Sequence, residues 1–243
     1  DILLYVLICI WGIGVSIFAK HHSKVFQVIG ELGILISMLF GCALCINEGD
    51  ADKFFVLLIY YLVSSGVFYW MHYEKEFSKN LLHHICNIIS LLALATGCYD
   101  FGNEALYAKE VWMVIIIATL SFAGALTHKQ EEDGIGFGIL SSAYLLIIYF
   151  MIETFCPNDK MFSMIAYFMS IPLLVLLEWR KMYCKEGKYI VQGVVTGMML
   201  LGLSGWGDMY SYGAVPMLIL PLLLCGFLLK NPVWKYGSLV AMI

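Results

Sequence analysis

Four polar side chains interrupt segments that are otherwise apolar, and two of them can exchange protons near neutral pH. These residues are Glu31, His84, Asn87 and Gln192. A carboxylate inside a long apolar segment is costly unless it is paired or protonated, so it indicates a functional site. A histidine partner would let Glu31 take up and release protons. The sequence therefore predicts a transport or proton site formed by these four residues. The alternative is a structural role, in which they pair with one another or reach interfacial water.

A second candidate for chemistry is Gly205-Trp206-Gly207-Asp208, which directly follows an apolar segment. Two neighbouring carboxylates can share a proton and activate water. The motif resembles that of the GxGD membrane aspartyl peptidases, the prepilin peptidases and presenilin-like enzymes. This resemblance implies catalysis by two aspartates, Asp159 as the first and Asp208 as the second. Tyr210 stands where prepilin peptidases usually carry a lysine, and the motif expected around Asp159 is missing.

Four of the eight cysteines lie at or near the ends of three apolar segments: Cys42, Cys45, Cys98 and Cys156. In an oxidising compartment, cysteines at one level of the molecule can be cross-linked. The order Cys42-Ala-Leu-Cys45 is also similar to the redox pair of the DsbB family of quinone-linked disulfide oxidases. A structural disulfide is the preferred interpretation, and a catalytic one is the alternative.

Nine apolar segments must position these side chains. With 61% hydrophobic and 13% charged residues, the chain carries about half the charge of a soluble domain, which is about 25%. The segments are long enough to cross about 30 Å of hydrocarbon as helices. The predicted fold is an all-α polytopic transmembrane bundle in one integral membrane domain over 1–243, with nine spans and a partial tenth within 233–243. The spans are 2–19, 25–46, 54–71, 81–97, 110–127, 135–155, 161–177, 189–204 and 213–229.

The basic residues alternate between the loops that join these segments. Of the 14 lysines and arginines, only Lys53, Lys109 and Lys160 lie in one set of loops, and the others lie in the other set. Because cytoplasmic loops of membrane proteins are enriched in basic residues, this predicts an outer N-terminus and cytoplasmic basic loops in a plasma or inner membrane. Glu31, His84, Asn87 and Gln192 then lie within two helical turns of the inner surface. Asp159 and Asp208 lie outside, opposite to the side on which prepilin peptidases work.

These patterns favour a permease or channel-like transporter of a small solute or ion, proton-coupled through Glu31 and His84. An intramembrane GxGD-type aspartyl peptidase is one alternative, and a non-catalytic membrane subunit or sensor is another. The expected partners are the lipid bilayer, the transported solute or ion, and a second copy or a membrane complex. The acidic outer loops argue against nucleic acid. No cofactor or metal site is predicted, since His83-His84-Ile-Cys86 lacks metal-ligand spacing.

Overall fold

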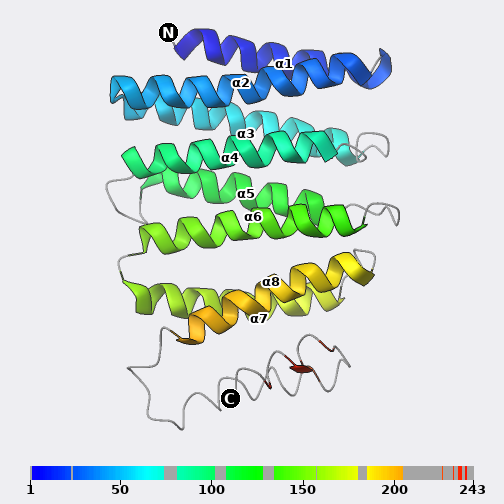
Figure 1. Ribbon diagram of the computed structural model, residues 1–243. Helices are drawn as coiled ribbons and strands as arrows, with labels where there is room; N and C mark the ends of the chain where they lie inside the picture. The colour runs from blue at the N-terminus through cyan, green and yellow to red at the C-terminus, as the bar shows by residue number, and fades with distance from the viewer. Residues whose placement is uncertain are drawn as a thin grey trace. The chain divides into compact units, whose positions relative to one another are not determined.

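The computed structural model describes residues 2–22, 24–73, 81–101, 108–127, 134–156, 158–179 and 185–204, with a few single positions between 226 and 239. Within these residues the protein forms α-helices and no strand (Figure 1). The helices are α1 (Ile2–His22), α2 (Lys24–Glu48), α3 (Ala51–Tyr73), α4 (Leu81–Phe101), α5 (Lys109–Thr127), α6 (Gly134–Phe155), α7 (Asp159–Trp179) and α8 (Lys185–Ser204).

The predicted all-helical fold is confirmed, and these eight helices match the first eight predicted segments to within about four residues at each end. Four contain a stretch long and apolar enough to span a membrane: Val28–Glu48, Leu82–Phe101, Lys109–Leu126 and Gly134–Phe155. Helices of this kind are typical of an integral membrane protein. Ile2–Val15 and Met161–Leu177 are shorter apolar stretches. The described residues thus show fewer spans than the nine predicted, and most of 213–229 and 233–243 lies outside them.

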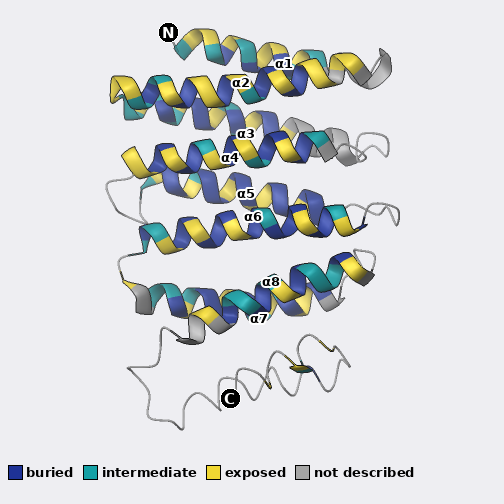
Figure 2. Cartoon of the chain, in the orientation of Figure 1, coloured by how far each residue is buried: buried dark blue, intermediate teal, exposed yellow. Residues whose placement is uncertain are grey.

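Exposed and buried residues alternate along the helices (Figure 2), and many of the exposed residues are large and apolar. On α4, Leu91 and Leu94 are fully buried, whereas Ile89 and Leu92 are 40% and 49% exposed. A soluble protein rarely exposes so much contiguous apolar surface. In a bilayer these faces contact lipid tails, which are as apolar as the side chains themselves.

The chain divides into two compact units. The first contains residues 1–128 and 143–155, which form α1 to α5 and the C-terminal part of α6. In this unit α2 packs against α4, and α3 packs against α5. Contacts of α2 with α3 and of α4 with α5 join these pairs into two layers, and α1 packs on α2 and α3. The candidate site described below lies within this unit.

The second unit contains residues 129–142 and 156–243. Here α7 and α8 pack along each other, and the start of α6 approaches α8 closely. A Cβ atom added to Gly138 would lie 2.7 Å from the Cα of Gly187. Such contact between two backbones is possible only with small residues. The single membrane domain expected over 1–243 stays a prediction.

A tight turn joins α2 to α3. Gly49 has a φ of +66°, and its N–H donates to the Ile46 carbonyl at 3.2 Å. The N–H of Asp50 donates to the Cys45 carbonyl, also at 3.2 Å. This pair of bonds is the Schellman motif, which favours glycine because its αL residue has a positive φ. The two helices are therefore joined without a flexible loop.

Asp50 also caps the N-terminus of α3. Its Oδ1 accepts a hydrogen bond from the Lys53 N–H at 3.0 Å. The Lys53 ammonium lies 2.5 Å from Glu48 and 3.2 Å from Asp50. Hydrogen bonds from the Lys53 backbone N–H, and then from its side chain, hold the pKa of Asp50 below its usual value. Hydrogen bonds to Glu48, and then to Asp50, raise the pKa of Lys53.

Candidate functional site

A buried polar cluster lies inside the first unit, surrounded by apolar packing. Its members come from α2 to α6 and are all less than a tenth exposed: Glu31, Tyr61, His83, His84, Asn87, Ser121 and Tyr144. The cluster lies toward the end of the unit at which α2 and α4 begin and α3 and α5 end. At about 1.5 Å per residue, Glu31 lies about 10 Å along α2 from its first residue. Glu31 therefore lies well inside its helix, whereas His83 and His84 lie in the first turn of α4.

Glu31 and His83 form a buried pair between α2 and α4. The Nδ1 of His83 lies 2.8 Å from Oε2 of Glu31, and the two side chains are 11% and 2% exposed. The second carboxylate oxygen, Oε1, has no hydrogen-bond partner among the described residues. A buried carboxylate with one unmatched oxygen is costly, so a proton, a water molecule or a cation is needed there.

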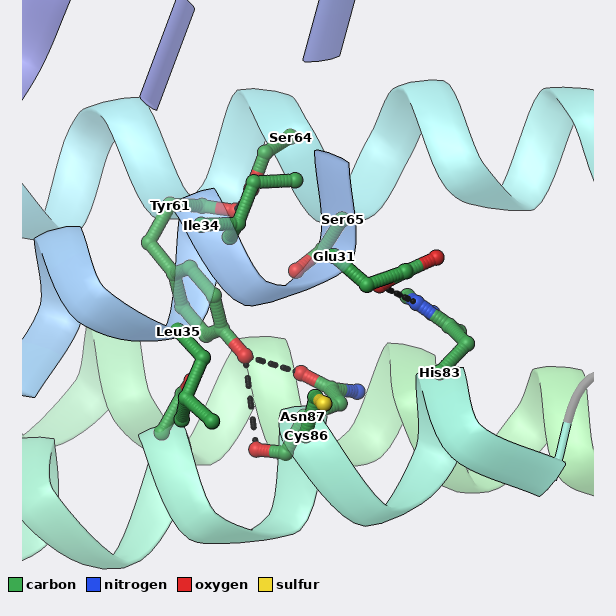
Figure 3. Close-up of a pocket in the computed structure, with 10 residues that line it drawn as sticks. Glu31, Ile34, Leu35, Tyr61, Ser64, Ser65, His83, Cys86 and Asn87 are labelled. Carbon is green, nitrogen blue, oxygen red and sulfur yellow. Dashed lines mark hydrogen bonds and ion pairs between the residues drawn. The ribbon is translucent and has the colours of Figure 1, made fainter. Parts of the chain in front are cut away.

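Asn87 joins four helices through its side-chain amide. Its Nδ2 donates to Ser121 of α5 at 2.8 Å and to Tyr144 of α6 at 3.0 Å. Its Oδ1 accepts from the hydroxyl of Tyr61 on α3, which also donates to the Asn87 backbone carbonyl at 3.3 Å (Figure 3). Both amide hydrogens and the amide oxygen are thus used.

His84 shares the Tyr144 hydroxyl with Asn87. The Nδ1 of His84 lies 3.1 Å from that oxygen, and the backbone carbonyl of His84 lies 3.3 Å from it. With neutral His84, Tyr144 can donate to Nδ1. With protonated His84, Nδ1 donates instead and Tyr144 can donate to the carbonyl. Both protonation states are compatible with these positions of the heavy atoms.

A small pocket adjoins the Glu31–His83 pair. It is lined by residues of α2, α3 and α4, and the polar ones are Glu31, Tyr61, Ser64, Ser65, His83, Asn87 and Ser90. Figure 3 shows Glu31 and His83 on one side of it and the hydroxyl of Tyr61 with Asn87 on the other. Its volume is about 10 Å³, enough for about one water molecule. The pocket can hold a water molecule that carries a proton, or a small ion, but it is too small for an organic solute.

Three of the four predicted transport residues belong to this cluster: Glu31, His84 and Asn87. The histidine that contacts Glu31 is His83, whereas His84 contacts Tyr144. Gln192 is fully buried on α8. It lies in the second unit, so its predicted place beside the others stays a prediction.

Sequence reasoning did not single out several members of the cluster: Tyr61, His83, Ser121 and Tyr144. For Tyr61 and Tyr144, the available signal was a tyrosine inside an apolar segment. On α3 this signal was strengthened by Ser64 and Ser65, which follow Tyr61 by three and four residues and share its face of the helix.

Of the two aspartates of the peptidase hypothesis, Asp159 alone lies among the described residues. Asp159 is the first residue of α7. The helix is capped by Asn158, whose Oδ1 accepts the Met161 N–H at 2.7 Å. Asp208 lies outside the described residues, so the catalytic pair stays a prediction.

The cysteines at the opposite end of the first unit are free thiols. Cys42, Cys45 and Cys98 are buried and form no disulfide among themselves. The Cys42 thiol donates to the Ala93 carbonyl at 3.2 Å. Cys156 follows α6 directly and belongs to the second unit. Among the residues that the structure describes, no group of three histidine, cysteine or acidic side chains is placed to hold a metal ion.

No protein-family model, curated protein or solved structure matches the chain.

Proposed function

We propose that this protein is a membrane transporter of a small solute or ion, and that Glu31 and His83 couple its transport to proton movement. The buried Glu31–His83 pair is the observation that supports the proposal. Both residues lie within stretches long and apolar enough to span a membrane, Val28–Glu48 and Leu82–Phe101. An ionisable pair at such a position is retained at a cost in stability and is typical of proton pathways.

The pair is suited to proton exchange because the gain or loss of one proton changes its net charge. Histidine is the side chain that ordinarily gains and loses a proton near neutral pH. When His83 is protonated, the pair is an ion pair with no net charge. When His83 is neutral, the carboxylate of Glu31 leaves an uncompensated charge between the helices. A change in proton occupancy therefore changes the free energy of this packing, which is the requirement for coupling.

The proposal includes the topology inferred from the basic loops. It has nine spans and a partial tenth, an outer N-terminus and cytoplasmic basic loops. The buried polar cluster then lies toward the cytoplasmic half of the membrane. His84, Asn87 and Tyr144 hold the surrounding helices together, and Gln192 remains a candidate for solute contact.

The test is proton movement in liposomes that contain the purified protein and a trapped pH-sensitive dye. Amino acids, sugars and inorganic cations are added in turn to find a solute that drives proton flux. We expect Glu31→Gln to reduce this flux about 100-fold, the lower range for loss of a positioned proton-transfer group. Glu153→Gln, an exposed carboxylate on α6, is the matched control and should retain it.

Two results would count against the transporter. One is a solute-driven flux that Glu31→Gln leaves unchanged. The other is cleavage of a fluorogenic transmembrane peptide that is lost in Asp208→Asn, which would favour the aspartyl peptidase instead.

A further inference from the structure

Three polar residues that line the pocket, Ser64, Tyr61 and Asn87, have committed their hydrogens to protein acceptors. Ser64 donates to the Tyr61 carbonyl at 2.8 Å, and the Tyr61 hydroxyl donates to Asn87. Asn87 in turn donates both amide hydrogens away from the pocket, to α5 and α6. Toward the pocket, these three residues therefore present oxygen lone pairs, which can accept hydrogen bonds or bind a cation.

The carboxylate of Glu31 adds a negative charge to this set of acceptors. An ionised carboxylate has only acceptor sites. One of its oxygens takes the hydrogen from His83 Nδ1, and Oε1 has no partner among the described residues. With a neutral His83 the pocket carries one net negative charge. No lysine or arginine stands among the described residues that line it.

We propose that this pocket binds one small monovalent cation such as Na⁺. Glu31 Oε1 supplies the charge, and the hydroxyl and amide oxygens of Ser64, Tyr61 and Asn87 supply further ligands. Oxygen is the ligand that hard cations select. A single carboxylate matches a single positive charge, whereas a divalent ion would leave an excess of charge in the apolar interior. The volume, about that of one water molecule, excludes organic cations.

The cation site rests on the proposed function in one respect, because the same carboxylate carries the proton. The cation and the proton then compete for Oε1 of Glu31. The other titratable groups around the pocket are His83 and Cys86 on the same helix as Asn87, Tyr61 on α3, Cys9 of α1 beside Ser64, and His84 with Tyr144 beyond Asn87. Competition of this kind would exchange one ion for the other during transport. Binding can nevertheless be measured without any transport.

The experiment follows the melting temperature of the detergent-solubilised protein by its intrinsic fluorescence. Sodium chloride replaces choline chloride at constant total chloride. We expect a rise of roughly 3–6 °C when Na⁺ reaches about ten times its dissociation constant. Choline is the reference cation, because it is too large for the pocket. Ammonium chloride forms a third arm, and a shift with ammonium alone would overturn the sodium assignment in favour of a hydrogen-bonded cation.

Three variants identify the site. Glu31→Gln should lose the sodium-dependent shift. Ser64→Ala keeps the carboxylate and should raise the dissociation constant for Na⁺ about tenfold. If Glu31→Gln does not fold, this variant tests whether Na⁺ binds in the pocket. Ser37→Ala is the control, since Ser37 is buried on α2, donates to the Gly33 carbonyl at 2.8 Å and does not line the pocket.

Equal melting temperatures in sodium and choline, or a shift that survives in Glu31→Gln, would overturn the cation site. These outcomes are separate from those for transport. A sodium-dependent shift without proton flux would refute the transporter and keep the cation site. Proton flux without a sodium-dependent shift would refute the cation site and keep the transporter.

Discussion

At the scale of single residues, Asn87 organises the buried polar cluster. Its amide contacts side chains from three other helices, Tyr61, Ser121 and Tyr144. In lipid, a side-chain hydrogen bond between helices contributes about 0.6 kcal/mol on average and up to about 1.7 kcal/mol. Three such bonds made by one residue are therefore a substantial part of the stability of the first unit.

We expect Asn87→Leu to lower the free energy of unfolding by about 2–3 kcal/mol, because it removes three bonds and leaves buried hydroxyl groups without their partner. The measurement is reversible unfolding in mixed micelles. Thr96→Val on the same helix is the control: its hydroxyl is exposed and bonds only to the Ala93 carbonyl of its own helix. Equal effects of the two variants would show that Asn87 does not organise the cluster.

The sequence predicted that Glu31, His84 and Asn87 matter, because each is a polar residue inside an apolar segment. It did not predict which histidine would contact Glu31. Neighbouring residues on a helix differ by about 100° in direction, so His83 and His84 face different partners. The choice depends on how α4 is rotated against α2 and α6, and hydropathy carries no information on that rotation.

At the scale of elements, hydropathy predicts where a helix crosses lipid better than where the helix ends. The segment predicted over 81–97 continues as a helix to Phe101, because backbone hydrogen bonding does not stop where the apolar residues stop. The start of α3 at Ala51 was predicted three residues too late. The signal was present in Gly49-Asp50, a helix-ending glycine followed by a capping aspartate.

The Asp50 cap leads to a prediction on pH. Since hydrogen bonds from Lys53 lower the pKa of Asp50 in the folded protein, the folded state binds this proton more weakly than the unfolded state does. The stabilisation is complete above the ordinary aspartate pKa of about 4 and is lost as the pH falls below it. We expect the melting temperature of Asp50→Asn to fall less than that of the wild type between about pH 6 and about pH 3.

The control for this prediction is Glu153→Gln, which removes an exposed carboxylate far along the chain from the turn and should retain the pH dependence of the wild type. If Asp50→Asn and the wild type lose stability in parallel as the pH falls, the cap does not contribute through its charge.

At the scale of the whole molecule, the alternating basic loops lead to a prediction on sidedness. An epitope inserted within 74–80, next to Lys75 and Lys79, should react with antibody only after cells are permeabilised. An epitope within 102–107 should react on intact cells. Reaction of both sites on intact cells, or the reverse order, would contradict the inferred orientation and move the buried polar cluster to the outer half of the membrane.

The four-helix junction at Asn87 also bears on how the protein is made. Helices enter the membrane in the order of synthesis, so α3, α4 and α5 are present before the ribosome has produced Tyr144 on α6. Until then, Asn87 and His84 lack one of their partners and expose polar groups inside the bilayer. A chain halted before α6 would resemble an unassembled subunit, the kind of molecule that membrane quality-control proteases remove. We therefore expect the nascent chain to become resistant to degradation once the sixth helix has emerged.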